Sequence, residues 1–231
     1  MTVLSFPAPD WPTLPVLDSD ARLPVRRVFC VGRNYAAHAA EMGAQVQADA
    51  PFYFTKSALA VVPSGRSLPY PPMTQDYHHE VELVVAIGKP GFRLAADAAM
   101  EAVFGYGVGL DMTRRDVQAL AKSRGHPWDM AKDGEGSAVI GPITPAAGFT
   151  PAGQRIALSV NDQIRQDGVL SDMVWAVPAL IADLSRWVHL APGDLILTGT
   201  PAGVGPVAPG DRLCGRIPGL APVSLTIGPP E

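Results

Sequence analysis

Hydrophobic positions along the chain fall into short runs, most of them ended by Gly, Pro, Asn or Asp. Short apolar runs bounded by such turn residues are typical of β-strands. We therefore expect strands at 28–31, 52–55, 59–62, 80–87, 105–110, 156–160, 163–167, 194–198, 211–214 and 223–227. Residues 69–72, with three prolines, predict a stiff loop, and Asn161-Asp162 predicts a turn.

A few segments favour helix instead. These are 35–42, 94–102, 113–124 and 175–188, the last with Pro178 in its first turn. Asn34 is the expected N-cap of the first helix, and Gly43 its C-terminal stop. No βαβ rhythm and no GxGxxG sequence occurs, which disfavours a dinucleotide-binding fold. The pattern as a whole predicts a β-rich α+β protein.

Composition agrees with one large, well-buried domain. The chain has 231 residues, of which 47% are hydrophobic and 17% charged, and its mean hydropathy is +0.14. Residues 1–24, rich in Pro, Asp and Ala, are expected to form an extended N-terminal arm, and residues 25–231 the catalytic domain.

Charge and cysteine content narrow the class of protein further. The net charge is −4, and the largest basic clusters are the pairs Arg26-Arg27 and Arg114-Arg115, so no nucleic-acid partner is expected. Cys30 and Cys214 lie far apart and are predicted to be buried, reduced thiols. No basic residue precedes Arg22 and no apolar run is long enough to span a membrane. We therefore expect a cytoplasmic protein.

Two acidic residues open the most apolar strand. Side chains alternate along a strand, so Glu80 and Glu82 point to one face, roughly 7 Å apart by strand rise. Two carboxylates beside a core persist only if they are protonated, paired or bound to a cation. Oxygen ligands favour Mg²⁺, Mn²⁺ or Ca²⁺. The alternative is an edge strand whose two glutamates face water.

A third acid, Asp111, follows the Gly-rich strand and would complete a three-carboxylate site. Zinc is less expected, because this set holds no cysteine. His78 has the same strand parity as the two glutamates, so a mixed His/Glu site stays open.

Several polar residues outside this set could carry chemistry. His38 and Glu41 are three residues apart on a helix, the arrangement of a general base with its orienting carboxylate, or of an ordinary surface contact. Arg115 and Gln118 share a helix face, where Arg115 could bind a substrate carboxylate or pair with Asp116 or Glu101.

Two further segments offer groups of the same kind. Lys132 lies in a stretch rich in Gly and charge, where a lysine is usually solvated. The loop 198–205 is dense in glycine and could cradle an anion with its N–H groups, but no Gly-Lys-Ser/Thr follows, so it is not a Walker A motif.

These motifs together resemble the fumarylacetoacetate hydrolase family. The resemblance rests on Gly32-Arg33-Asn34-Tyr35 with His38 and Glu41, His79-Glu80-Val81-Glu82-Leu83, Asp111 with Arg115 and Gln118, Lys132, and Thr198-Gly199-Thr200-Pro201 with Gly203-Val204-Gly205. Their order and spacing hold from about residue 25 to the C-terminus. The length and the first motif are closest to the compact acylpyruvate and fumarylpyruvate hydrolases. One departure is that Gly134 and Glu135 stand where the family usually has Phe-Asp.

The resemblance implies a mixed β-sandwich roll of the fumarylacetoacetase C-terminal-domain type, in a homodimer. It implies Mg²⁺ or Mn²⁺ at Glu80, Glu82 and Asp111. It also implies three catalytic residues, His38, Glu41 and Lys132. The substrate contacts that it implies are Arg33, Tyr35, Arg115, Gln118, Gly199 and Thr200.

The resulting hypothesis is hydrolysis of a carbon–carbon bond in an acylpyruvate-type diketo acid. His38, oriented by Glu41, would activate water, and the metal with Lys132 would stabilise the expelled pyruvate enolate. Aromatic compound catabolism is the associated role. The same site could instead serve oxaloacetate decarboxylation or hydroxydienoate isomerisation. An inactive binding or scaffold protein is the alternative from another class.

Overall fold

The largest sheet of the protein forms its centre. The structure, a computed structural model, describes residues 4–43, 46 and 49–231. The sheet runs in the order β4 (Phe52–Lys56), β3 (Arg27–Gly32), β15 (Asp194–Leu197), β8 (Val81–Ile87), β9 (Val103–Asp111), β11 (Ala138–Ile140) and β5 (Val61–Pro63), with β12 (Thr144–Pro145) also paired to β9.

A second sheet packs against the first. Its strands are β14 (Gln163–Val169), β13 (Arg155–Val160), β17 (Arg212–Arg216), β18 (Val223–Pro230) and β6 (Arg66–Tyr70). Two smaller sheets contain β10 (Thr113–Arg114), β7 (Tyr77–His79) and β16 (Gly205–Pro206), and β1 (Thr13–Pro15) with β2 (Arg22–Pro24). This is the expected β-rich mixed sandwich.

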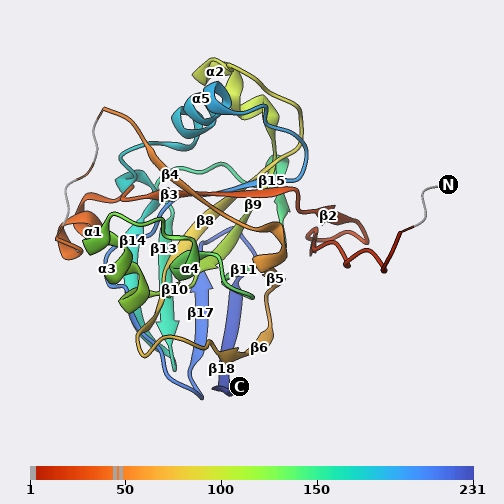
Figure 1. The fold of residues 1–231 in the computed structure, drawn as a ribbon. Coiled ribbons are helices and arrows are strands. Elements are labelled where there is room, and N and C mark those ends of the chain that lie inside the picture. The colour runs from red at the N-terminus through yellow and green to blue at the C-terminus, as the bar shows by residue number, and fades with distance from the viewer. Residues whose placement is uncertain (1–3, 44–45, 47–48) are drawn as a thin grey trace.

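The helices are short and lie outside the sheets. They are α1 (Ala36–Glu41), α2 (Ala96–Ala99), α3 (Arg115–Arg124), α4 (Asp129–Lys132) and α5 (Val177–Trp187), with 3₁₀ turns at Ala58–Ala60, Met100–Ala102, Ala146–Gly148 and Leu170–Asp172. Figure 1 shows α1, α3 and α4 on one side of the molecule and α2 with α5 at the top. None of these described helices is long and apolar enough to cross a membrane.

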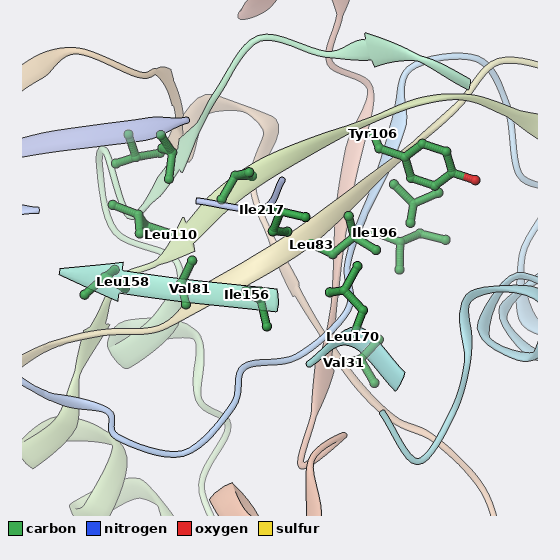
Figure 2. Packing of buried hydrophobic residues seen from close by; sticks show 14 of the residues in the cluster. Val31, Val81, Leu83, Tyr106, Leu110, Ile156, Leu158, Leu170, Ile196 and Ile217 are labelled. Carbon is green, nitrogen blue, oxygen red and sulfur yellow. The ribbon is translucent and has the colours of Figure 1, made fainter. Parts of the chain in front are cut away.

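Both faces of the central sheet are buried at β8. Successive side chains of a strand point to opposite faces, and every residue of β8 is buried. Val81 and Leu83 point into the core shared with Ile156 and Leu158 of β13 (Figure 2). Val84, on the opposite face, packs in a second cluster with residues of the β1–β2 hairpin and of β3. Glu82 has the parity of Val84 and therefore leaves the main core free of charge.

The β1–β2 hairpin of the N-terminal segment packs against the central sheet. Leu14 and Leu23 of the β1–β2 hairpin are buried in the second cluster, beside Val28 of β3. The division of the chain at residue 24 stays a prediction.

Two predicted elements differ from the structure. The strand expected at 59–62 begins as the 3₁₀ turn Ala58–Ala60 and becomes extended only at Val61. The predicted loop at 69–72 is wrong at its start, because Pro69 and Tyr70 end β6. β6 is an edge strand paired only with β18, and a proline without an N–H is tolerated there.

Asn34 does not cap the first helix. The N-cap of α1 is Tyr35, which makes no capping bond. The Asn34 side chain instead donates to Thr198 O at 2.8 Å and accepts from Trp175 N at 2.8 Å. It therefore ties together three segments that are distant in sequence.

Most other local predictions are confirmed. Gly125 ends α3 in the left-handed region with φ 65°, and Asn161 and Asp162 turn the chain between β13 and β14 with positive φ values. The basic pair Arg26-Arg27 binds the buried Asp194 at 3.0 and 2.7 Å. Both cysteines are free, as predicted, and Cys30 is buried. The prediction that Cys214 is buried is wrong, because this residue lies on the partly exposed face of β17.

Candidate active site

Sheet topology brings the predicted acids to one edge of the central sheet. β8 runs antiparallel to both β9 and β15, so its start lies beside their ends, and β3 runs parallel to β15. Glu80 precedes β8, Asp111 ends β9, and the glycine-rich loop follows β15. Segments far apart in the sequence thus meet at a single point.

Three carboxylates converge there. One oxygen from each of Glu80, Glu82 and Asp111 lies within 4.8 Å of the others. All three residues are buried, with exposed fractions of 5%, 2% and 0%. The alternative of an edge strand whose glutamates face water is therefore wrong, because β8 is a central strand buried on both faces.

Three cations surround the carboxylates. Lys132 Nζ lies 2.8 Å from Glu80 Oε2 and 2.9 Å from Asp111 Oδ2. Lys56 Nζ lies 2.8 Å from Asp111 Oδ1, and Arg115 donates to Glu80. Lys132 is 2% exposed, so it is not the solvated lysine that its local sequence suggests. Arg115 pairs with Glu80 rather than with Asp116 or Glu101.

The three acids differ in their electrostatic environment. Burial alone raises the pKa of Glu80, but the charges of Lys132 and Arg115 outweigh burial and bring it below its ordinary value. Burial, Asp111 and Glu80 together raise the pKa of Glu82 well above its ordinary value. Glu82 accepts one bond from Gly199 N at 2.7 Å. It is therefore the acid that most lacks compensating positive charge.

This donor set suits a hard divalent cation. It offers only carboxylate oxygens from three residues, which is the chemistry of Mg²⁺ or Mn²⁺ sites. His78 does not join the group, because its Nε2 lies 2.8 Å from Asp76. A cation would also neutralise Glu82, which has no close ammonium or guanidinium partner among the described residues.

The His38–Glu41 pair is present at the same site. His38 Nδ1 lies 3.4 Å from Glu41 Oε2, and both Glu41 oxygens accept from Gly203 N at 3.1 and 3.2 Å. Burial lowers the pKa of His38 below its ordinary 6.5, so the neutral base predominates at pH 7. The glycine-rich loop thus gives its N–H groups at Gly199 and Gly203 to protein carboxylates.

A buried glutamine connects the loop to the acid strand. Gln166, fully buried on β14, donates to Thr200 Oγ1 at 2.7 Å and to Pro201 O at 2.9 Å. Its carbonyl oxygen accepts from Val81 N at 3.0 Å and lies 2.9 Å from His79 Nδ1. The Thr200 hydroxyl in turn donates to Val81 O.

These groups surround a small cavity. Its volume is about 40 Å³, and its polar lining consists of Arg33, His38, Glu80, Glu82, Arg115, Gln118, Lys122, Lys132 and Thr200. Tyr35 is buried, and its hydroxyl has no hydrogen-bond partner in the part of the chain that the structure describes. Apart from Tyr35, which is not among the residues that line this cavity, the structure brings the predicted site residues together. Their individual roles stay predictions.

Three residues of the site were not predicted from the sequence. Lys56 shares strand parity with Phe54, which lines the cavity, and this parity was the signal available for it. Lys122 lies on the helix face of Arg115 and Gln118, and this spacing was the signal available for it. Gln166 had no local signal, because its neighbours come from other elements. Where the family usually has Phe-Asp, Gly134 packs near the Arg114 guanidinium, and the preceding Asp133 accepts from Ser57 N at 2.7 Å.

Comparisons with known proteins identify one family, whose similar members include two kinds of enzyme. The family model of the fumarylacetoacetate (FAA) hydrolase C-terminal domain matches residues 27–227. A fumarylpyruvate hydrolase of a Ralstonia species is 52% identical over 180 residues, which are 78% of this chain and 94% of that protein. An oxaloacetate tautomerase of Escherichia coli (strain K12) is 43% identical over 192 residues, 82% of this chain and 87% of the relative.

A solved structure covers nearly all of both chains. It is the crystal structure of fumarylpyruvate hydrolase from Pseudomonas aeruginosa in complex with Mn²⁺ and pyruvate. The TM-score is 0.94 at 45% sequence identity, over 98% of this chain and 100% of that one. The likeness therefore extends from sequence to fold.

Proposed function

This chain belongs to the fumarylacetoacetate hydrolase family, and we propose that it is a metal-dependent hydrolase of fumarylpyruvate or a closely related acylpyruvate. The products would be pyruvate and a carboxylic acid. One observation carries the proposal: a general-base pair, a buried lysine and three buried carboxylates line or adjoin the same cavity. The relatives support an enzyme, so an inactive scaffold is not proposed.

The acid cluster is the proposed metal site. Glu80, Glu82 and Asp111 would hold Mg²⁺ or Mn²⁺, which supplies Lewis acidity toward the keto-acid end of the substrate. The Mn²⁺ and pyruvate in the Pseudomonas aeruginosa structure support this assignment. The choice between the two metals stays a proposal.

The base for hydrolysis is His38. Its Nδ1 faces Glu41, so Nδ1 carries the proton and Nε2 is free to take one from water. Glu41, anchored by Gly203 N, fixes this tautomer. The resulting hydroxide attacks the distal carbonyl carbon, and the bond between that carbon and the adjacent CH₂ breaks.

The leaving group is the pyruvate enolate, which takes the electron pair of the broken bond. Lys132, buried against Glu80 and Asp111, places a positive charge in the cavity where this anion develops. Gln118 accepts from Arg115 at 2.7 Å, which leaves its NH₂ group for a substrate oxygen. Return of the proton that His38 took from water to the enolate carbon gives pyruvate, restores the neutral base and completes the reaction.

A second candidate is chemistry on the enolate without cleavage, such as oxaloacetate tautomerisation, decarboxylation or isomerisation. The 43% identical oxaloacetate tautomerase favours it. Such reactions need the acid cluster but no water attacking an acyl carbon. A homodimer, a cytoplasmic location, the lack of nucleic-acid and membrane partners, and a role in aromatic compound catabolism stay predictions.

The test is a spectrophotometric screen of fumarylpyruvate, acetylpyruvate and oxaloacetate with Mn²⁺ or Mg²⁺, with products identified. The proposal predicts loss of the enol absorbance with equal amounts of pyruvate and acid. His38→Ala should abolish cleavage and still bind Mn²⁺. Tautomerisation of oxaloacetate without cleavage of either acylpyruvate would favour the second candidate.

A further inference from the structure

Two cations that line the active-site cavity have no acidic partner among the residues that the structure describes. Arg33 follows β3 and is half-buried, and Lys122 lies in the last turn of α3. Within the described residues, neither side chain forms an ion pair or a hydrogen bond; each contacts only an aromatic ring. Lys56, Arg115 and Lys132 differ, since each is paired with an acid of the cluster.

Aromatic rings hold the two cations. The Arg33 guanidinium carbon lies 5.9 Å from the centroid of the Phe52 ring, and Lys122 Nζ lies 5.0 Å from that of Trp128. The two rings contact each other edge to face at 5.1 Å. Cation–π contacts leave the N–H donors free, so both groups can still bind an anion.

The surroundings of Lys122 are positively charged. Burial, Arg115 and Arg33 lower its pKa below the ordinary value. An anion bound between Arg33 and Lys122 would relieve this mutual repulsion. With a cation held by the acid cluster, the site would thus carry positive charge at two places, one at that cluster and one at these two residues.

Helix geometry sets the distance between the two places. Arg115, Gln118 and Lys122 occupy one face of α3, and Arg115 binds Glu80. Lys122 lies roughly 10 Å farther along the helix axis, from a rise of about 1.5 Å per residue. An extended seven-carbon chain separates its terminal carboxyl carbons by roughly 7–8 Å, given a C–C bond of about 1.5 Å. The length of the Arg33 and Lys122 side chains covers the difference between these two distances.

We propose that Arg33 and Lys122 form a subsite for a second carboxylate at the far end of the acyl chain. Diketo acids with two carboxylates, such as fumarylpyruvate, would then be preferred to those with one, such as acetylpyruvate. The inference rests on the proposed function, since the keto-acid end must lie at the acid cluster.

The test compares the two substrates in the Mn²⁺-loaded enzyme. Variants are Arg33→Asn, which suits the left-handed backbone at this position (φ 59°), and Lys122→Met. Arg124→Met is the matched control, because residue 124 lies about 200° around the helix from Lys122. We expect each test variant to lose about tenfold in kcat/KM for fumarylpyruvate, as for a charge-assisted hydrogen bond. The loss should be smaller for acetylpyruvate, and Arg124→Met should behave like the wild type on both substrates.

A binding measurement separates the subsite from the reaction. Calorimetry with fumarate and with crotonate, which has a methyl group in place of one carboxylate, should show tighter binding of fumarate by the wild type only. Equal losses on both substrates, or no preference for fumarate in the wild type, would overturn the subsite. If the wild type cleaves neither diketo acid, the proposed function fails, and the calorimetry still decides the subsite.

Discussion

At the scale of single residues, the buried lysine at position 56 shows how the acid cluster is sustained. Its ammonium contacts Asp111 at 2.8 Å, Ser137 Oγ at 3.0 Å and Met112 O at 3.3 Å, and its side chain is fully buried. Without Lys56, the buried Asp111 would keep only Lys132, which it shares with Glu80, and buried charge that loses a partner is costly. Lys56 therefore stabilises Asp111 in the metal-free protein.

Lys56→Met should lower the free energy of unfolding of the metal-free enzyme by about 3–5 kcal/mol, as for other broken buried pairs. Mn²⁺ should raise the melting temperature of this variant more than that of the wild type, because the cation neutralises Asp111. Calorimetry with and without Mn²⁺ measures both. Lys89→Met, at an exposed lysine, is the control. An equal Mn²⁺ effect in both proteins would count against this role.

The general base makes a prediction about pH. Burial lowers the pKa of His38, while the hydrogen bond and charge of Glu41 raise it. The charge of Glu80 also raises the pKa and stays in place. Glu41→Gln removes the contributions of Glu41, so the pKa of His38 falls further and the base form persists to lower pH. The acidic limb of kcat against pH, at saturating Mn²⁺, should move to lower pH, with a lower plateau.

Asp76→Asn is the control for this shift, because Asp76 contacts His78 and not His38. It should leave the acidic limb of kcat in place. An acidic limb that stays fixed in Glu41→Gln would show that another group controls activity.

At the scale of elements, the loop after β15 holds the general-base pair through its backbone. Gly203 has φ 92°, and a Cβ atom there would lie 2.2 Å from Arg165 O. Gly210 has φ 96° with no atom within 4 Å of the same position. An alanine would have a strained backbone at either position, because φ is positive at both. The two positions differ in the room that they leave for a Cβ atom.

Gly210→Ala should therefore cost about 1 kcal/mol in the free energy of unfolding, from backbone strain alone. Gly203→Ala should cost about 2–4 kcal/mol, because overpacking adds to the strain. Only Gly203→Ala should lower kcat, since it displaces the N–H that anchors Glu41. Urea denaturation and steady-state kinetics give both values, and equal losses would refute the packing argument.

Sequence patterns predicted the elements where a local rule governs them. Gly125 ends α3, and β8 is a continuous buried strand, as its apolar run requires. The patterns failed where tertiary partners decide. The Asn34 side chain donates a hydrogen bond to Thr198 O instead of capping α1. Pro69 lies in the edge strand β6, which pairs with β18.

At the scale of the whole molecule, the site exists because two sheets are joined at Gln166. This residue belongs to the second sheet, yet it bonds to Val81 of the first sheet and to the Thr200 loop. Sequence reasoning found Glu80, Glu82 and Asp111 from residue type and strand parity. It could not find Gln166, whose partners lie 34 and 85 residues away.

Gln166→Leu should remove all of these bonds and leave Thr200, Pro201 O and Val81 N without them. We expect a loss of roughly 2–4 kcal/mol in the free energy of unfolding, as for buried polar groups left unsatisfied. Gln163→Leu, at an exposed position of the same strand, is the control. Indistinguishable melting temperatures for the two variants would contradict the proposal that Gln166 joins the two sheets.

The central claim is that the buried carboxylates hold a divalent cation on which carbon–carbon cleavage depends. Its most direct test titrates Mn²⁺ into chelator-treated enzyme, with binding and fumarylpyruvate cleavage measured at each point. We expect one ion per chain, turnover proportional to occupancy, and neither binding nor cleavage in Glu82→Ala. Full cleavage by the chelator-treated enzyme, or by Glu82→Ala, would contradict it.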